Sequence, residues 1–339
     1  MGKIVWVILI TLLLTSGCTK NSQPAKEIKQ PETSVKTIEK NTVGTYFPLI
    51  EDTIYTYKGT GNEYAAKVST VEYLRGRIAQ FNTNNGGTSL SEVFVVGQGV
   101  IKKTFSKGES YWREDFTGIK GQEEIILQQP FKIGTTWKSN GKIFRIADVD
   151  AKVTVPYGTY SAIKVVNELQ DATFSRYFSP DIGIIKEEYL SAGNFITSEL
   201  EEIKTEPSKI RYDLYYFDKK DEKLVAIKED ALFHTNESIA EKVLTQLKTP
   251  PNTELSRVIP FDTRLLSYHR EDTALRLNFS KELLTGLNAG AGFEELFIDA
   301  IVNTFAKAYG VEGVIINVED MPYESGHFGF GKDEVLKVK

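Results

Sequence analysis

The sequence contains very few residues that bind transition metals or form disulfides. One cysteine and three histidines occur among 339 residues, so an internal disulfide, a multi-cysteine zinc site and an iron–sulfur cluster are excluded. Basic residues are not in excess either, because 41 Lys and Arg stand against 46 Asp and Glu, a formal charge of −5. Since a nucleic-acid binder needs a basic face, we expect no nucleic-acid partner.

Glycine, proline and charged residues are also not over-represented. The chain has 26 Gly and 11 Pro, with 41% hydrophobic and 26% charged residues, which are ordinary globular proportions. Wholesale disorder and a collagen-like repeat are thereby excluded. At about 100–200 residues per domain, the length predicts two domains.

Long apolar runs are scarce, and the one that stands out covers residues 4–14, interrupted only by Thr11. It follows Lys3 and is too short to cross about 30 Å of hydrocarbon comfortably. A positive charge followed by a short apolar run is typical of a signal peptide. We therefore predict that the protein is exported.

Residues 14–18, Leu-Thr-Ser-Gly-Cys, end this run and resemble the lipobox of bacterial lipoproteins. The resemblance implies that residues 1–17 are removed and that Cys18 is acylated with fatty acids such as palmitate. It also implies a lipid anchor in the cell membrane on the extracytoplasmic face. The alternative is an ordinary secretory signal with an incidental cysteine.

Residues 18–45 are predicted to form a disordered tether behind the lipidated Cys18. The segment consists mainly of Lys, Glu, Gln, Thr, Ser and Pro and contains no aromatic residue. Such a composition cannot bury enough apolar area to offset the entropy lost on ordering.

Residues 46–204 are predicted to form an all-β antiparallel domain. Tyr, Phe, Val, Ile and Thr become frequent, and turn sequences rich in Asn, Gly and Pro recur at residues 84–87, 139–141, 155–158 and 192–194. Half-barrel, barrel and sandwich remain open as architectures.

The many aromatic residues of this region have two interpretations. Trp112, Trp137 and the tyrosines either fill the core of the β-domain or line a concave binding face. We favour the core, because aromatic side chains bury large areas in β-proteins.

Residues 205–339 are predicted to form an α+β domain with two helices on one face of a small sheet. A hairpin is expected over residues 212–228, and a helix after Ser238, where Ser238-x-x-Glu241 has the pattern of a capping box. Apolar residues at helical spacing predict a second helix over residues 293–308.

Six segments of the same region occur in an order that is typical of one known family. They are residues 214–217, 258–260 with 263–266, 277–280, 300–305, 310–314 and 324–327. Through them the region resembles the GerMN domain, which is named for sporulation and germination proteins. The resemblance implies a small α+β fold similar to the ring-building motifs of secretion-type assemblies. It further implies an extracytoplasmic, often lipid-anchored location and a structural or assembly role without catalytic residues.

Candidate catalytic and metal-binding patterns are weak. Residues 326–332 match most of a phosphate-binding loop, but Asp333 stands where Ser or Thr is needed. His234, His269 and His327 fall in different predicted elements, so we expect no metal site. We expect the ring of His327 to hydrogen-bond a local carbonyl and fix the C-terminal turn.

Adjacent acids are the remaining catalytic candidates. A glycosidase needs two carboxyl groups facing each other across a cleft. Neighbouring acids on a strand point to opposite faces, and acids in the first turn of a helix are favoured by its dipole. We therefore predict solvated faces for the three pairs Glu187-Glu188, Glu201-Glu202 and Glu294-Glu295.

These expectations favour a non-enzymatic, membrane-anchored envelope lipoprotein with a structural or protein-interaction role through the GerMN-like domain. Its partners would be membrane lipid through acylated Cys18 and an envelope protein or a second copy, with no cofactor. The alternative is a carrier or sensor that binds a lipid or a saccharide in the β-domain. An envelope hydrolase ranks third.

Overall fold

A computed structural model describes residues 42–168, 171–287 and 290–339 of the chain. Cys18, the signal peptide and most of the tether lie outside these residues, so the predictions made for them are not tested. Val43 is already buried in a short 3-10 turn, η1 (Val43–Tyr46). Val43 therefore already belongs to the folded core, ahead of the predicted boundary at residue 46.

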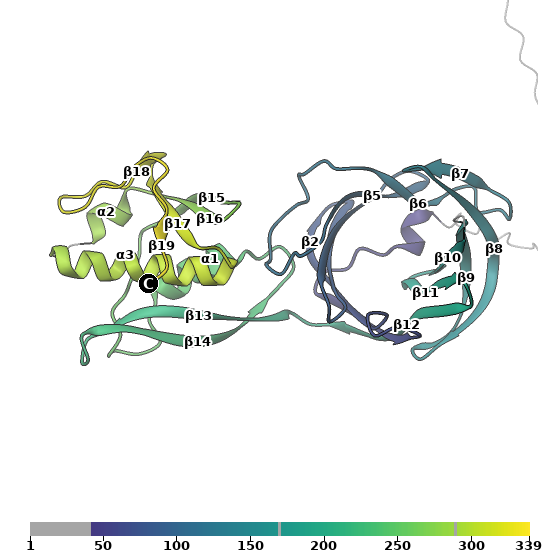
Figure 1. The fold of residues 1–339 in the computed structure, drawn as a ribbon, viewed down its shortest axis with the longest axis horizontal. Helices are drawn as coiled ribbons and strands as arrows, with labels where there is room; N and C mark the ends of the chain where they lie inside the picture. The colour runs from purple at the N-terminus through teal and green to yellow at the C-terminus, as the bar shows by residue number, and fades with distance from the viewer. Residues whose placement is uncertain (1–41, 169–170, 288–289) are drawn as a thin grey trace, which may run out of the picture. The chain divides into compact units, whose positions relative to one another are not determined.

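Twelve of the described strands form one antiparallel sheet, here called the large sheet (Figure 1). Neighbours in the sheet follow the order β6-β5-β4-β3-β2-β1-β12-β11-β10-β9-β8-β7. The strands are β1 (Thr53–Thr60), β2 (Lys67–Arg75), β3 (Ile78–Asn84), β4 (Ser89–Val96), β5 (Val100–Lys107), β6 (Glu124–Gln128), β7 (Thr136–Ser139), β8 (Lys142–Val155), β9 (Gly158–Glu168), β10 (Ala172–Ser179), β11 (Gly183–Ser191) and β12 (Asn194–Thr205).

The large sheet rolls up until its two edge strands meet. Trp137 of β7 donates its indole N–H to the carbonyl of Ile125 in β6 at 2.9 Å, and the Ile125 N–H donates to the hydroxyl of Ser139 at 2.8 Å. Side chains thus replace a backbone ladder at the seam. The antiparallel all-β prediction is confirmed, whereas the sandwich alternative is wrong because one nearly closed sheet surrounds one core.

All four predicted turns separate consecutive strands. At the β7–β8 turn, Asn140 and Gly141 have φ of 49° and 72°, the left-handed conformation that Asn and Gly adopt at low cost. At the β11–β12 turn, Ala192 and Gly193 adopt the same conformation, with φ of 47° and 81°. The residue types of these turn sequences were therefore sufficient to predict where the hairpins turn.

The core of the large sheet is rich in aromatic side chains. Phe47, which follows η1, packs against Phe81 and Phe94 with ring centroids 5.6 and 5.2 Å apart. The η1 turn packs against β5 and β11, which lie far apart in the sheet order. The segment before β1 therefore fills part of the interior that the rolled sheet surrounds.

The C-terminal residues form a hairpin, three helices and a mixed sheet. In the sheet, β16 and β17 are parallel and β15 is the edge strand, in the order β15-β16-β17-β18 with β19 also paired to β17. The elements are β13 (Ser208–Asp218), β14 (Lys223–Phe233), α1 (Ile239–Lys248), β15 (Leu265–Glu271), β16 (Ala274–Phe279), α2 (Glu282–Gly286), α3 (Ala291–Tyr309), β17 (Gly313–Val318), β18 (Met321–Pro322) and β19 (Leu336–Lys337).

Helices α1 and α3 pack against both the mixed sheet and the β13–β14 hairpin (Figure 1). The predicted hairpin, both long helices and the Ser238 cap are confirmed: the Ser238 hydroxyl accepts the N–H of Ala240 at 3.1 Å. The hairpin is a separate two-stranded sheet on the far side of the helices, so the predicted single sheet with helices on one face is incomplete.

Two hydrophobic cores accompany this organisation. One lies inside the large sheet, and the other joins β13, α1, α3 and the mixed sheet. Residues 41–339 nevertheless form one compact unit. The predicted division into domains at residues 204 and 205 therefore stays a prediction.

Replacing Trp137 by alanine tests the seam of the large sheet. The change removes the hydrogen bond to Ile125 and a ring that stacks on Phe144 at 5.6 Å. We expect the free energy of unfolding to fall by about 3–5 kcal/mol in urea denaturation. Ile133→Ala, at an exposed site, is the control and should change it by less than about 0.5 kcal/mol. Equal effects of the two substitutions would contradict the role of Trp137.

Candidate binding site

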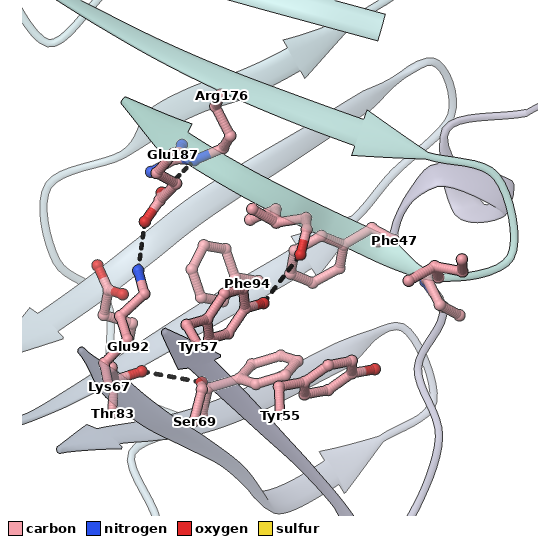
Figure 2. Close-up of a pocket in the computed structure, with 15 residues that line it drawn as sticks. Phe47, Tyr55, Tyr57, Lys67, Ser69, Thr83, Glu92, Phe94, Arg176 and Glu187 are labelled. Atoms are coloured by element: carbon pink, nitrogen blue, oxygen red, sulfur yellow. Dashed lines mark hydrogen bonds and ion pairs between the residues drawn. The ribbon is translucent and has the colours of Figure 1, made fainter. Parts of the chain in front are cut away.

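Two adjoining hollows lie within the large sheet. The inner hollow measures about 80 Å³ and is lined mainly by apolar and aromatic side chains, among them Phe47, Tyr55, Tyr57 and Phe94 (Figure 2). The outer hollow measures about 560 Å³, and polar residues are more frequent among those that line it. Only the outer one has the volume of a typical ligand pocket, which is about 300–1,000 Å³.

Five residues line both hollows: Lys67, Thr83, Glu92, Arg176 and Glu187. The Glu187 carboxylate accepts hydrogen bonds from the Lys67 ammonium and, at 2.7 Å, from Nε of Arg176 (Figure 2). Lys67 and Glu187 side chains are only 22% and 14% exposed. A mostly buried triad of charges therefore separates the two hollows.

The triad continues into a longer series of ion pairs. Lys103 contacts Glu92 at 3.0 Å and Glu124 at 3.9 Å, and Lys142 donates to Glu124 at 2.7 Å. Together with Lys67, Arg176 and Glu187 these residues form what we call the interior ion-pair layer. Its members come from β2, β4, β5, β6, β8, β10 and β11.

Electrostatics keep the layer charged. Burial opposes ionisation of Glu187, but the positive charges of Lys67 and Arg176 outweigh it and hold the Glu187 pKa well below its usual range. Burial likewise opposes ionisation of Glu124, and the hydrogen bond from Lys142 and the charge of Lys103 lower its pKa. Neither carboxylate carries a proton near neutral pH, so neither can serve as a general acid there.

The outer hollow adds aromatic and amide side chains to these charges. Phe174 lies beneath the Arg176 guanidinium, with 5.1 Å from the guanidinium carbon to the ring centre. Tyr64, Tyr189 and Asn85 also line the hollow. The site thus combines flat apolar faces with paired donors and acceptors.

Neither tryptophan that the sequence singled out lines these hollows. Trp137 closes the seam of the sheet, and Trp112 packs on Gly310, where an added Cβ would lie 1.7 Å from the indole ring. The core interpretation is confirmed for Trp137. The sequence analysis missed Arg176, although its place between Phe174 and Phe178 on one face of a strand was a usable signal.

In two of the acidic pairs predicted to be solvated, one acid is not, whereas Glu295 and the pair Glu201-Glu202 are exposed as predicted. Glu187 belongs to the interior layer, and Glu294 is buried and accepts the Tyr323 hydroxyl at 2.7 Å. Glu188 has different partners from Glu187, because it contacts Lys186 at 3.0 Å and accepts the Tyr177 hydroxyl at 2.7 Å. Adjacent acids on β11 thus point in opposite directions, as expected, but both are paired.

The three histidines lie in separate surroundings. His234 Nδ1 is 2.7 Å from Asp52, and His269 Nε2 is 2.8 Å from Glu271. At His327 it is the backbone N–H that donates to the Ser325 hydroxyl, so Ser325 organises this turn and the predicted role of the His327 ring is wrong. In the described part of the chain, no three metal-binding side chains cluster.

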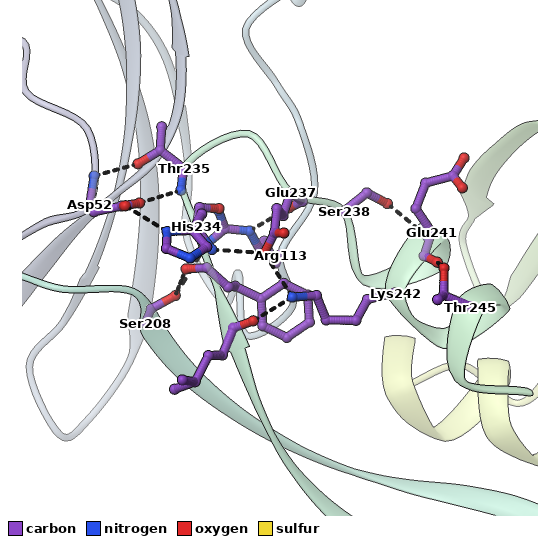
Figure 3. Close-up of polar contacts among 12 residues, drawn as sticks. Asp52, Arg113, Ser208, His234, Thr235, Glu237, Ser238, Glu241, Lys242 and Thr245 are labelled. Carbon is purple, nitrogen blue, oxygen red and sulfur yellow. Dashed lines mark hydrogen bonds and ion pairs between the residues drawn. The ribbon is translucent and has the colours of Figure 1, made fainter. Parts of the chain in front are cut away.

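Arg113 connects the large sheet to the segment after β14 (Figure 3). It is 3% exposed and donates to the backbone carbonyls of Glu72, His234 and Glu237 at 2.7, 2.8 and 2.9 Å. Asp52 accepts the N–H of Thr235 at 2.7 Å. These hydrogen bonds satisfy backbone groups that burial would otherwise leave unpaired.

Edge strand β15 borders a third hollow, of about 520 Å³. Its Leu266 is 44% exposed, and Tyr268 and Arg270 also line the hollow. An edge strand presents backbone N–H and C=O groups that can pair with another strand. This edge is therefore a candidate contact surface for a protein partner.

Within the described ranges, no helix is both long and apolar enough to cross a membrane.

The chain matches known proteins in part. Residues 213–324 match the Germane family model, which is described as "Sporulation and spore germination". None of the curated proteins compared with the chain matches it.

Several solved structures are similar to parts of the chain. The first GerMN domain of the sporulation protein GerM from Bacillus subtilis is 19% identical, over 37% of this chain and 97% of that one, with a TM-score of 0.31. An exported protein with a YmcC-like fold from Bacteroides fragilis is 15% identical, over 47% and 98%, with a TM-score of 0.33. A protein named as a lipoprotein from Clostridium perfringens is 24% identical, over 39% and 94%, with a TM-score of 0.24.

The substitution Glu187→Gln tests the interior ion-pair layer. Because the Glu187 pKa is lower in the folded protein than its ordinary value of 4.5, its ion pairs stabilise the fold above that pH. This stabilisation is lost as the pH falls toward the lowered pKa. We expect the variant to lose about 3 kcal/mol of unfolding free energy at neutral pH, since Lys67 and Arg176 are left unpaired. Its stability should also fall less steeply in acid than that of the wild type.

Chemical denaturation from neutral pH into acid measures both effects. Glu168→Gln is the control, because Glu168 pairs with Arg145 at 2.8 Å on the exposed surface. It should change the unfolding free energy by less than about 1 kcal/mol. A Glu187→Gln protein as stable as the wild type at neutral pH would show that the layer does not stabilise the fold.

Proposed function

We propose that this protein is a non-enzymatic component of the bacterial cell envelope that acts through contacts with another protein, because residues 213–324 match the Germane family model. The family match carries the proposal, since its description names developmental processes and no reaction. The proposal that the protein is not an enzyme is supported by Glu187 and Glu124, because both carboxylates are paired with cations.

The amino-terminal sequence supports the location. Residues 14–18 resemble a lipobox after a short apolar run, and an acylated Cys18 would hold the folded chain on the extracytoplasmic face of the cell membrane. More than one acyl chain gives stable anchoring, since each buried CH₂ contributes about 0.8 kcal/mol.

The proposed protein contact would form at the edge strand β15. A partner strand adding to this edge would gain backbone hydrogen bonds, and Leu266 would supply apolar contact beside them. The partner is an envelope protein with an extended segment or a second copy of this chain.

Introducing a charge at the edge tests this route. Leu266→Glu should weaken the complex about tenfold, or about 1.4 kcal/mol, because a carboxylate must be desolvated in the contact. Crosslinking in the producing cells and sedimentation of the purified full chain measure partner binding and self-association. Ile143→Glu, at an exposed site on β8, is the control and should leave both unchanged. If Leu266→Glu retains full complex formation, the contact does not use β15.

Replacing Cys18 by serine tests the anchor. The variant should accumulate in the soluble fraction and lose incorporation of radiolabelled palmitate, because serine offers no thiol for acylation. Cell fractionation with immunodetection follows the protein, and Ser16→Thr, a small residue ahead of the cysteine, is the control that should remain in the membrane. A Cys18→Ser protein that stays in the membrane fraction would argue against lipid anchoring.

A further inference from the structure

The outer hollow of the large sheet has the size of a ligand site and lies apart from the edge strand proposed as the protein contact. Its volume is about 560 Å³. Residues of the β1–β2 turn, the β3–β4 turn and strands β10, β11 and β12 line it. The lining residues that the proposal uses are Tyr64, Asn85, Phe174, Arg176, Glu187 and Tyr189.

Aromatic side chains form part of the lining although they are accessible to water. Tyr64 and Tyr189 are 52% and 37% exposed. Tyr189 is the register partner of Phe174, so these two side chains leave neighbouring strands on the same face of the sheet. The Tyr64 ring lies against Gly87, where an added Cβ would come within 2.5 Å of it. Flat, accessible rings offer packing surface to the C–H faces of a sugar ring.

Polar groups in the hollow are held in fixed orientations. The Oδ1 atom of Asn85 accepts the N–H groups of Gly87 and Thr88 at 3.1 and 2.9 Å, which sets the direction of its amide nitrogen. Glu187 is held by Lys67 and Arg176. Such preorganised donors and acceptors reduce the entropy lost on binding.

The charge balance favours a neutral ligand. In the lining that the two hollows share, the cations Lys67 and Arg176 stand against the carboxylates Glu187 and Glu92, so the formal charges of these four side chains cancel. Glu188, which also lines the outer hollow, is paired with Lys186. A charged ligand would have to break these pairs or remain without a counter-charge, and either is costly in a mostly buried site. A hydroxyl group can donate to a paired carboxylate and accept from a paired cation without breaking the pair.

The dimensions argue against a lipid acyl chain. Beyond the interior ion-pair layer the inner hollow measures about 80 Å³. An apolar cavity of about 150 Å³ takes only a single benzene ring. The inner hollow, which lies beyond the interior ion-pair layer, is therefore too small for an acyl chain.

We propose that the outer hollow of the large sheet binds a neutral saccharide. Sugar rings pack on Tyr64 and the Phe174–Tyr189 pair, and their hydroxyl groups bond to Asn85 and the paired charges. This activity goes beyond the proposed protein contact and involves a different part of the chain.

Calorimetric titration of the detergent-solubilised full chain tests the proposal. The probes are N-acetylchitotetraose, maltotetraose and cellotetraose, with laurate as the lipid probe. We expect at least one glycan to bind and laurate not to compete with it. Absence of binding to all three glycans, or their displacement by laurate, would overturn the proposal.

Three variants locate the site. Tyr189→Ala and Tyr64→Ala should each weaken glycan binding at least tenfold. Tyr157→Ala removes an exposed tyrosine at the β8–β9 turn, which does not line the hollow, and should leave binding unchanged. Thermal denaturation of each variant checks folding. Folded Tyr189→Ala and Tyr64→Ala proteins that bind as the wild type does would place the ligand elsewhere and overturn the assignment.

Discussion

A mostly buried carboxylate held between two cations is the interaction on which the large sheet depends. Glu187 joins Lys67 of β2 to Arg176 of β10, and these strands are separated in the sheet order by β1, β12 and β11. The Arg176–Glu187 pair joins register partners on neighbouring strands, whereas the Lys67–Glu187 bond passes over β1 and β12. Breaking such a buried pair is costly, because the remaining charges lose their compensation. The layer consequently fixes the shape of the space on either side of it.

The interior ion-pair layer also limits the chemistry of the space inside the large sheet and determines which ligand groups suit it. Carboxylates that stay ionised and paired do not exchange protons near neutral pH, so neither Glu187 nor Glu124 acts as a general acid there. They still present lone pairs beside N–H donors, and this combination suits hydroxyl groups. The two contacts that we propose thus differ in kind: a protein strand at β15, in the region that matches the Germane family model, and a small neutral ligand in the large sheet.

Local sequence signals predicted much of the fold but little of the site. Asn140-Gly141 placed a hairpin because left-handed conformations are local, and Ser238 placed the start of α1 for the same reason. The closure of β6 on β7 was not predictable, because side-chain hydrogen bonds and not a strand ladder with a turn signal make it. Glu187 was expected in solvent since a charged residue on a strand usually faces water. Its partner Arg176 lies on the adjacent hairpin strand, but Lys67 is 120 residues away in the sequence, and only the rolled sheet brings it to Glu187.

The most direct test of the account is the titration of the Glu187 carboxyl in the folded protein, followed by carbon-13 NMR with labelled glutamate. Comparison with Glu187→Gln assigns the signal. The account predicts that this carboxyl stays ionised well below pH 4.5, the ordinary value for glutamate. A Glu187 signal that titrates at or above that pH would show that the charges do not hold it, and would contradict a paired and preorganised interior.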